Sequence, residues 1–209
     1  MRKLIYLFFL TLLFGCNENK RNNENQKIVE VTREIAIPSV QNWPLTGITI
    51  TDTGLFFNQD KVYKMSVSDE ASLTARITIE ELKLNYFGGK YRVSLIVKPG
   101  EFGSRLGLRI QEVYPRRTDV VFNLNDQKVM TLFKDGDITK DEKSIIEPLD
   151  EGWYKCTFFA DIESSYVMLI FGPTDPSKDV KIWESVAGLN YKNDLFFIPS
   201  SLKVEELED

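Results

Sequence analysis

The sequence predicts an all-β fold, an antiparallel sandwich or barrel built as a single domain. Three observations support this. Apolar and polar residues alternate over many short runs, Gly, Pro, Asn and Asp separate these runs, and no apolar period of 3.6 residues is sustained. The chain that follows the N-terminal segment described next is long enough to bury one hydrophobic core.

The first 15 residues predict export. Arg2 and Lys3 form a positive start, and Leu4–Phe14 is apolar except for one threonine. As a helix this run would be about 16 Å long, which is too short for a hydrocarbon core of roughly 30 Å. The alternative is a buried first helix.

The residues that follow this run resemble the lipobox of bacterial lipoproteins. They read Leu13-Phe14-Gly15-Cys16, with the bulky Phe14 where a smaller residue is usual. The resemblance implies that residues 1–15 are a signal peptide, that cleavage precedes Cys16, and that Cys16 carries diacylglycerol and a fatty acid such as palmitate. Asn17 is not aspartate, so no inner-membrane retention signal of the enterobacterial type is present, and we expect the outer membrane of the cell envelope.

Composition excludes several function classes. Removing Arg2 and Lys3 changes the net charge from −5 to 24 − 31 = −7, and an acidic chain is a poor nucleic-acid binder. The absence of histidine excludes Ser-His-Asp and Cys-His catalysis and histidine-rich zinc sites, whereas glycosidases that use two carboxylates stay possible. With Cys16 lipidated, Cys156 has no disulfide partner and is expected to be an inert core residue.

In chain order we expect a tether, a β domain and an acidic end. Residues 16–27 hold the lipidated cysteine and a stretch with no apolar residue, Asn17–Lys27, which predicts a flexible tether; a polar loop packed on the domain is the alternative. Residues 28–202 form the β domain, and residues 203–209 are expected to be a solvated acidic tail. The expected strands cover residues 28–32, 48–51, 76–79, 91–97, 105–111, 119–124, 153–159, 166–171 and 180–184.

Several short motifs then occur in a fixed order. They are Asn42-Trp43-Pro44-Leu45, Gly89-Lys90-Tyr91-Arg92-Val93-Ser94, Val97-Lys98-Pro99-Gly100, Val121-Phe122-Asn123-Leu124, Gly152-Trp153-Tyr154-Lys155-Cys156 and Lys181-Ile182-Trp183-Glu184. This series resembles the jelly-roll carbohydrate-binding modules grouped loosely as families four, nine and twenty-two, found on polysaccharide-degrading enzymes and phage structural proteins. The resemblance implies a jelly-roll β-sandwich and association with glycans, although a fold does not fix a function.

Aromatic residues are candidates for stacking on sugar rings. Trp43, Trp153 and Trp183 lie in the motifs of the resemblance, where such residues usually fill the core, so we expect core roles for all three. Tyr114 precedes Pro115 in a polar stretch at the end of an expected strand, and it is the better stacking candidate.

Alternation also predicts a polar sheet face. Four arginines within residues 105–117 are opposed by one glutamate, a local charge of +3. Such polar side chains can form hydrogen bonds with sugar hydroxyls, and the planar guanidinium of arginine fits a uronate carboxylate or a sulfate. The alternative is a solvated outer face. The candidate ligand-binding residues are Arg105, Arg109, Gln111, Tyr114, Asp119, Asn123 and Lys155.

No other motif predicts chemistry. The acidic loop Asp135–Glu142 resembles a calcium loop but has Lys140 where an EF-hand needs glycine. We find no phosphate loop or dinucleotide fingerprint, and we expect no catalytic residue, metal or cofactor. Three readings remain: a non-catalytic glycan-binding lipoprotein, a structural module that holds protein partners at the envelope, and, least favoured, a small polysaccharide lyase or hydrolase.

Overall fold

The computed structural model describes residues 30–68, 75–85, 88–134, 137–138, 144–174 and 192–208. The predicted signal segment, Cys16 and the predicted tether therefore lie outside the described residues, as do Trp183 and most of the Asp135–Glu142 loop. Within the described part of the chain, no helix is long and apolar enough to cross a membrane.

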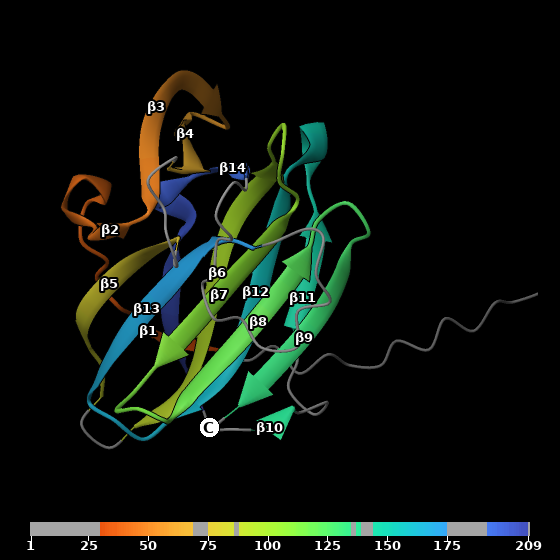
Figure 1. Ribbon diagram of the computed structural model, residues 1–209. Coiled ribbons are helices and arrows are strands. Elements are labelled where there is room, and N and C mark those ends of the chain that lie inside the picture. Colours follow the sequence, from red (N-terminus) through yellow and green to blue (C-terminus); the bar gives the residue numbers. More distant parts are fainter. Residues whose placement is uncertain are drawn as a thin grey trace, which may run out of the picture.

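The described strands form two antiparallel sheets, which confirms the predicted all-β sandwich. One sheet has the order β1-β15-β6-β14-β4-β3, with β12 also on β6 and β11 on β12. The other has the order β10-β9-β8-β7-β13-β5-β2. Figure 1 shows β13, β7, β8 and β9 side by side in front of β6 and β12.

The eight strands of the first sheet are β1 (Val31–Glu34), β3 (Ile48–Phe57), β4 (Asp60–Val67), β6 (Gly89–Pro99), β11 (Ser144–Pro148), β12 (Tyr154–Ile162), β14 (Asp194–Phe197) and β15 (Lys203–Leu207). The seven strands of the second are β2 (Leu45–Thr46), β5 (Arg76–Lys83), β7 (Arg105–Gln111), β8 (Arg117–Asn123), β9 (Lys128–Lys134), β10 (Asp137–Ile138) and β13 (Tyr166–Pro173). Three short 3₁₀ turns are also described: η1 (Val40–Asn42), η2 (Asp150–Gly152) and η3 (Pro199–Ser201).

The main core lies between the sheets, because alternate residues of each strand point to the same side. The inward residues of β7 are Leu106, Leu108 and Ile110, all fully buried. Trp43 joins this core as predicted, with its ring 5.6 Å from Phe171 and 6.2 Å from Phe197. Cys156 is buried there as well, and burial raises the pKa of its thiol, so it is an inert apolar side chain.

Trp153 is buried as predicted, but it packs outside the main core. Its exposed fraction is 4%, and its ring lies 5.1 Å from that of Phe57 in a smaller cluster with Val62 and Ile198. Cys156, which points into the main core, follows Trp153 by three residues, so along this extended backbone the two side chains point to opposite sides of the sheet. Trp153 therefore fills a hydrophobic cluster on the outer face of the eight-stranded sheet.

The C-terminal end forms a strand rather than the expected solvated tail. β15 lies between β1 and β6, and its Val204 is fully buried in the main core. Its acidic residues are paired with arginines of the neighbouring strands, Glu205 with Arg92 at 2.8 Å and Glu206 with Arg33 at 2.9 Å. The β domain thus extends through β15.

Replacing Trp153 with alanine should destabilise the fold. We expect a loss of about 3–5 kcal/mol in the free energy of unfolding, the range for truncating a large buried aromatic residue, measured by chemical denaturation. Tyr114→Ala is the matched control, because its ring is exposed and surface substitutions usually stay within about 0.5 kcal/mol. A Trp153→Ala protein of unchanged stability would show that the cluster contributes nothing to folding.

Candidate functional site

The predicted polar face lies on the outer side of the strand pair β7–β8. The antiparallel register places Arg105 opposite Asn123, Arg109 opposite Asp119, and Gln111 opposite Arg117. Because Leu106, Leu108 and Ile110 of β7 and Val120 and Phe122 of β8 point into the main core, these side chains share the outer face of the seven-stranded sheet, together with the apolar Val121. The structure therefore brings together five of the predicted residues: Arg105, Arg109, Gln111, Asp119 and Asn123.

Lys155 does not share this surface. It lies on β12 and pairs with Ile96 of β6, in the eight-stranded sheet. Both residues alternate with inward ones, so Lys155 points away from the sandwich on its opposite side. Alternation predicted the orientation of Lys155 relative to its own strand, but it contains no information about which sheet the strand joins.

A buried ion pair occupies the centre of the polar face. Arg109 donates two hydrogen bonds to Asp119, from Nε to Oδ1 at 2.6 Å and from Nη2 to Oδ2 at 2.7 Å. Both residues are buried, so the alternative of a solvated outer face is wrong for them. Burial raises the pKa of the Asp119 carboxyl, while the hydrogen bonds from Arg109 act in the opposite direction. Asn123 is buried too and donates to Asp126 at 2.7 Å.

The same carboxylate also contacts a second arginine, Arg117. The Nε atom of Arg117 lies 3.4 Å from Oδ2 of Asp119. The guanidinium carbon of Arg117 lies 5.5 Å from the ring centre of Tyr114, which is within the range of a cation–π contact. A buried carboxylate thus helps to hold the arginine that supports the Tyr114 ring.

The loop that carries Tyr114 is fixed by further hydrogen bonds. The amide of Glu112 donates to the carbonyl of Arg116 at 3.0 Å, and the amide of Arg116 donates to the carbonyl of Val113 at 3.1 Å. The next turn along this end of the sandwich is tied to it, because the amide of Glu163 donates to the Glu112 carboxylate at 3.0 Å. Glu163 also forms an ion pair with Arg116. In this setting Tyr114 is 72% exposed.

This arrangement suits the binding of a ligand through direct contact with exposed side chains. An exposed aromatic ring is held by a defined set of partners, with half-buried Gln111 in the register position opposite Arg117. Among the residues that the structure describes, no group of acidic or cysteine side chains could hold a metal ion. Sequence reasoning did not include Arg117 in the site. Its position next to the turn and opposite Gln111 is the signal that could have identified it.

Comparisons with known proteins find no matching family model and no matching curated protein. Among solved structures, the chain is similar to a beta-1,3-glucan binding CBM6 from Bacillus halodurans, with 8% identity, coverage of 86% of this chain and 100% of that one, and a TM-score of 0.40. It is also similar to TmCBM61 in complex with beta-1,4-galactotriose, with 14% identity, coverage of 64% and 88%, and a TM-score of 0.24. Likenesses this distant carry no ligand or residue role over to this chain.

Replacing Arg109 with alanine should destabilise the protein, in contrast to a substitution on a solvated face. Removing one partner of a buried ion pair leaves an uncompensated charge and typically costs about 3–5 kcal/mol. Arg116→Ala is the control, because its ion pair with Glu163 is exposed and such pairs contribute at most about 1 kcal/mol. Equal denaturation midpoints for the two variants would contradict a structural role for the Arg109–Asp119 pair.

Proposed function

We propose that this chain is a non-catalytic, glycan-binding lipoprotein whose β-sandwich contacts sugar through Tyr114 and the adjoining edge of the β7–β8 polar face. The observation that supports it most directly is the exposed Tyr114 ring held beside Arg117, itself in contact with a buried carboxylate. Tyrosine offers an apolar face and a hydroxyl in one rigid side chain, and so it fits a sugar ring, whose faces are apolar and whose rim carries hydroxyls.

Rigidity supports this role. A side chain that is ordered before its ligand arrives loses less conformational freedom when it binds. The hydrogen bonds of the Glu112–Arg116 loop and the Arg117 contact provide that order at Tyr114. Gln111, opposite Arg117 in the register, adds an amide group, which can both donate and accept hydrogen bonds to hydroxyls.

The charge of the site does not favour acidic glycans over uncharged ones. The sequence showed four arginines opposed by Glu112 alone. In the folded chain, Asp119 pairs with Arg109 and Arg117, and Glu163 pairs with Arg116. Because these carboxylates offset much of the local positive charge, an uncharged glycan is a suitable ligand for the edge around Tyr114.

A second function is supported by a different surface. The β3–β4 hairpin exposes Leu55 and Phe56, with exposed fractions of 59% and 63%. Adjacent exposed apolar side chains are typical of protein contact sites. This observation favours the alternative in which the domain holds a protein partner at the cell envelope.

Tyr114 provides the direct test of glycan binding. The mature chain would be titrated by calorimetry with a panel of neutral and acidic oligosaccharides. Tyr114→Ala should weaken binding by about 2 kcal/mol, as expected for an aromatic anchor residue, whereas Tyr114→Phe should keep most of the affinity because the ring remains. Absence of heat for every sugar with the wild-type chain would refute glycan binding and leave the assembly function.

The membrane anchor is tested separately at Cys16. Cys16→Ala should abolish labelling with a fatty-acid probe and leave an uncleaved precursor, since the thiol that receives the lipid is gone. One acyl chain binds a membrane only marginally, but the two or three chains of a lipoprotein suffice for stable attachment. If the variant is processed and stays with the membrane fraction like the wild type, the chain is not a lipoprotein.

A further inference from the structure

A groove of about 730 Å³ lies away from Tyr114, between the segment that follows β1, the β3–β4 hairpin and η3. Its volume falls within the roughly 300–1,000 Å³ typical of ligand sites. Figure 1 shows the β3–β4 hairpin at the top of the molecule, whereas β7 ends at the bottom, next to the loop that carries Tyr114. The groove and the Tyr114 edge are therefore separate surfaces.

The lining of the groove combines an aromatic and aliphatic floor with polar side chains. Trp43 and Tyr63 contribute rings, and Ile37 is one of the aliphatic residues. The indole Nε1 of Trp43 donates to the carbonyl of Pro38 at 2.8 Å, which fixes that ring. The hydrogen-bonding groups of the groove come from residues distant in sequence, including Ser39, Gln41, Gln59 and Ser200.

The charged residues of the groove are already paired. Glu34 accepts from Lys203 at 2.8 Å, and Lys61 lies 3.0 Å from the carboxylate of Asp52. Asp60 accepts a hydrogen bond from the Ser200 hydroxyl at 2.7 Å. No arginine is among the described residues that line the groove. The surface thus offers amides, hydroxyls and apolar faces, with one net negative charge on Asp60 once the two ion pairs are counted. This chemistry suits an uncharged sugar chain better than an acidic one.

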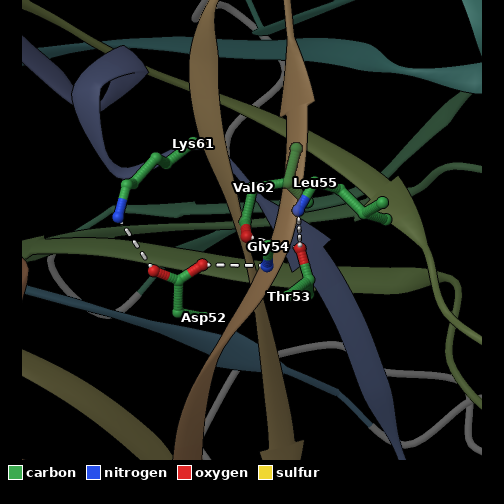
Figure 2. Close-up of polar contacts among 6 residues, drawn as sticks. All are labelled: Asp52, Thr53, Gly54, Leu55, Lys61 and Val62. Atoms are coloured by element: carbon green, nitrogen blue, oxygen red, sulfur yellow. Dashed lines mark hydrogen bonds and ion pairs between the residues drawn. The ribbon is translucent and has the colours of Figure 1, made fainter.

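The hairpin wall of the groove is held by its own hydrogen bonds (Figure 2). Asp52 accepts from the amide of Gly54 at 3.0 Å as well as from Lys61. Thr53 donates to the carbonyl of Val62 at 2.6 Å and accepts from the amide of Leu55 at 3.2 Å. The Gly54 amide and the Lys61 ammonium keep the pKa of Asp52 below its usual value.

At the tip of this hairpin, Gln59 occupies an unfavourable backbone position. Its φ is 74°, and that of Asn58 is 49°. Two-residue hairpin turns with positive φ at both positions strongly favour Asn-Gly. A glutamine there costs conformational energy, and strain of this kind is often retained at ligand-binding positions. Gln59 is also one of the residues that line the groove, and a glycine at this position would contribute no side chain to it.

We propose that this groove is a second glycan-binding site, selective for an uncharged sugar chain, and that Gln59 is one of its contact residues. The inference rests on the proposed function for the glycan class of its ligand, and it adds a site remote from Tyr114. Tyr63 provides the partly exposed ring on which a sugar packs, with the buried Trp43 beneath the groove, and Gln41, Gln59 and Ser200 provide hydrogen bonds to hydroxyls.

The test compares two chemically identical substitutions. Gln59→Gly removes a groove side chain and relaxes the turn. Gln127→Gly makes the same change at another positive-φ glutamine, with φ of 50°, in the β8–β9 turn outside the groove lining. Both variants should melt at the wild-type temperature or higher, because glycine adopts positive φ without strain.

Binding would be measured by calorimetry on the mature chain carrying Tyr114→Ala, so that the Tyr114 edge is weakened and the groove contributes most of the binding. The probes are hexasaccharides of neutral β-glucan, galactan, mannan and xylan, with hexagalacturonate as the charged comparison. We expect one neutral hexasaccharide to bind, with little dependence on salt. Gln59→Gly should lower its affinity roughly fivefold, the loss of about one hydrogen bond, and Gln127→Gly should leave it unchanged.

Four results would overturn the inference. Equal affinities of the Gln59→Gly and Gln127→Gly variants would remove Gln59 from the site. Stronger binding of hexagalacturonate than of every neutral probe would refute selectivity for uncharged sugar. Complete loss of binding on introducing Tyr114→Ala would eliminate the groove while leaving the proposed function intact, whereas a wild-type chain that binds no sugar would eliminate both.

Discussion

The architecture depends on the pairing of one strand, β6, along both of its edges. β12 follows one edge over nine residue pairs, from Gly89 to Val97. The other edge is divided between β15 at Tyr91–Ser94 and β14 at Val97–Pro99. Through these partners β6 connects the strands β1, β4 and β11 to one sheet. Its inward side chains Tyr91, Val93, Leu95 and Val97 are all fully buried, so this strand also supplies the centre of the core.

Strands with strict alternation and clear turns could be predicted from the sequence. β6, β7 and β13 were expected within two residues of their observed starts, because apolar residues repeat every second position and turn residues bound the runs. β15 was missed since three of its five residues are charged. Its charged side chains find partners only when distant strands come together, as Glu205 does with Arg92. The residues that neighbour β15 in the sequence do not reveal this pairing.

The candidate site shows the same limit. Alternation placed Arg109 and Asp119 on one face, and the structure agrees, yet it pairs them with each other and buries them. Lys155 followed the same alternation on a strand that joins the other sheet. An alternating pattern shows which side of its own strand a residue faces. The sheet that the strand joins, and the burial of the residue, follow from contacts between residues far apart in the sequence. The groove could not be predicted, because the segment after β1 that forms one wall has no period at all.

The pairing of β1 with β15 determines where mechanical tension from the N-terminal side enters the domain. The amide of Glu208 donates to the carbonyl of Glu30 at 3.0 Å, and β1 is an edge strand whose four side chains are all exposed. A pull on the segment before residue 30 therefore acts first on β1, which among the described strands pairs with β15 alone. The inner strand β6 would bear the load only after this edge pairing gives way.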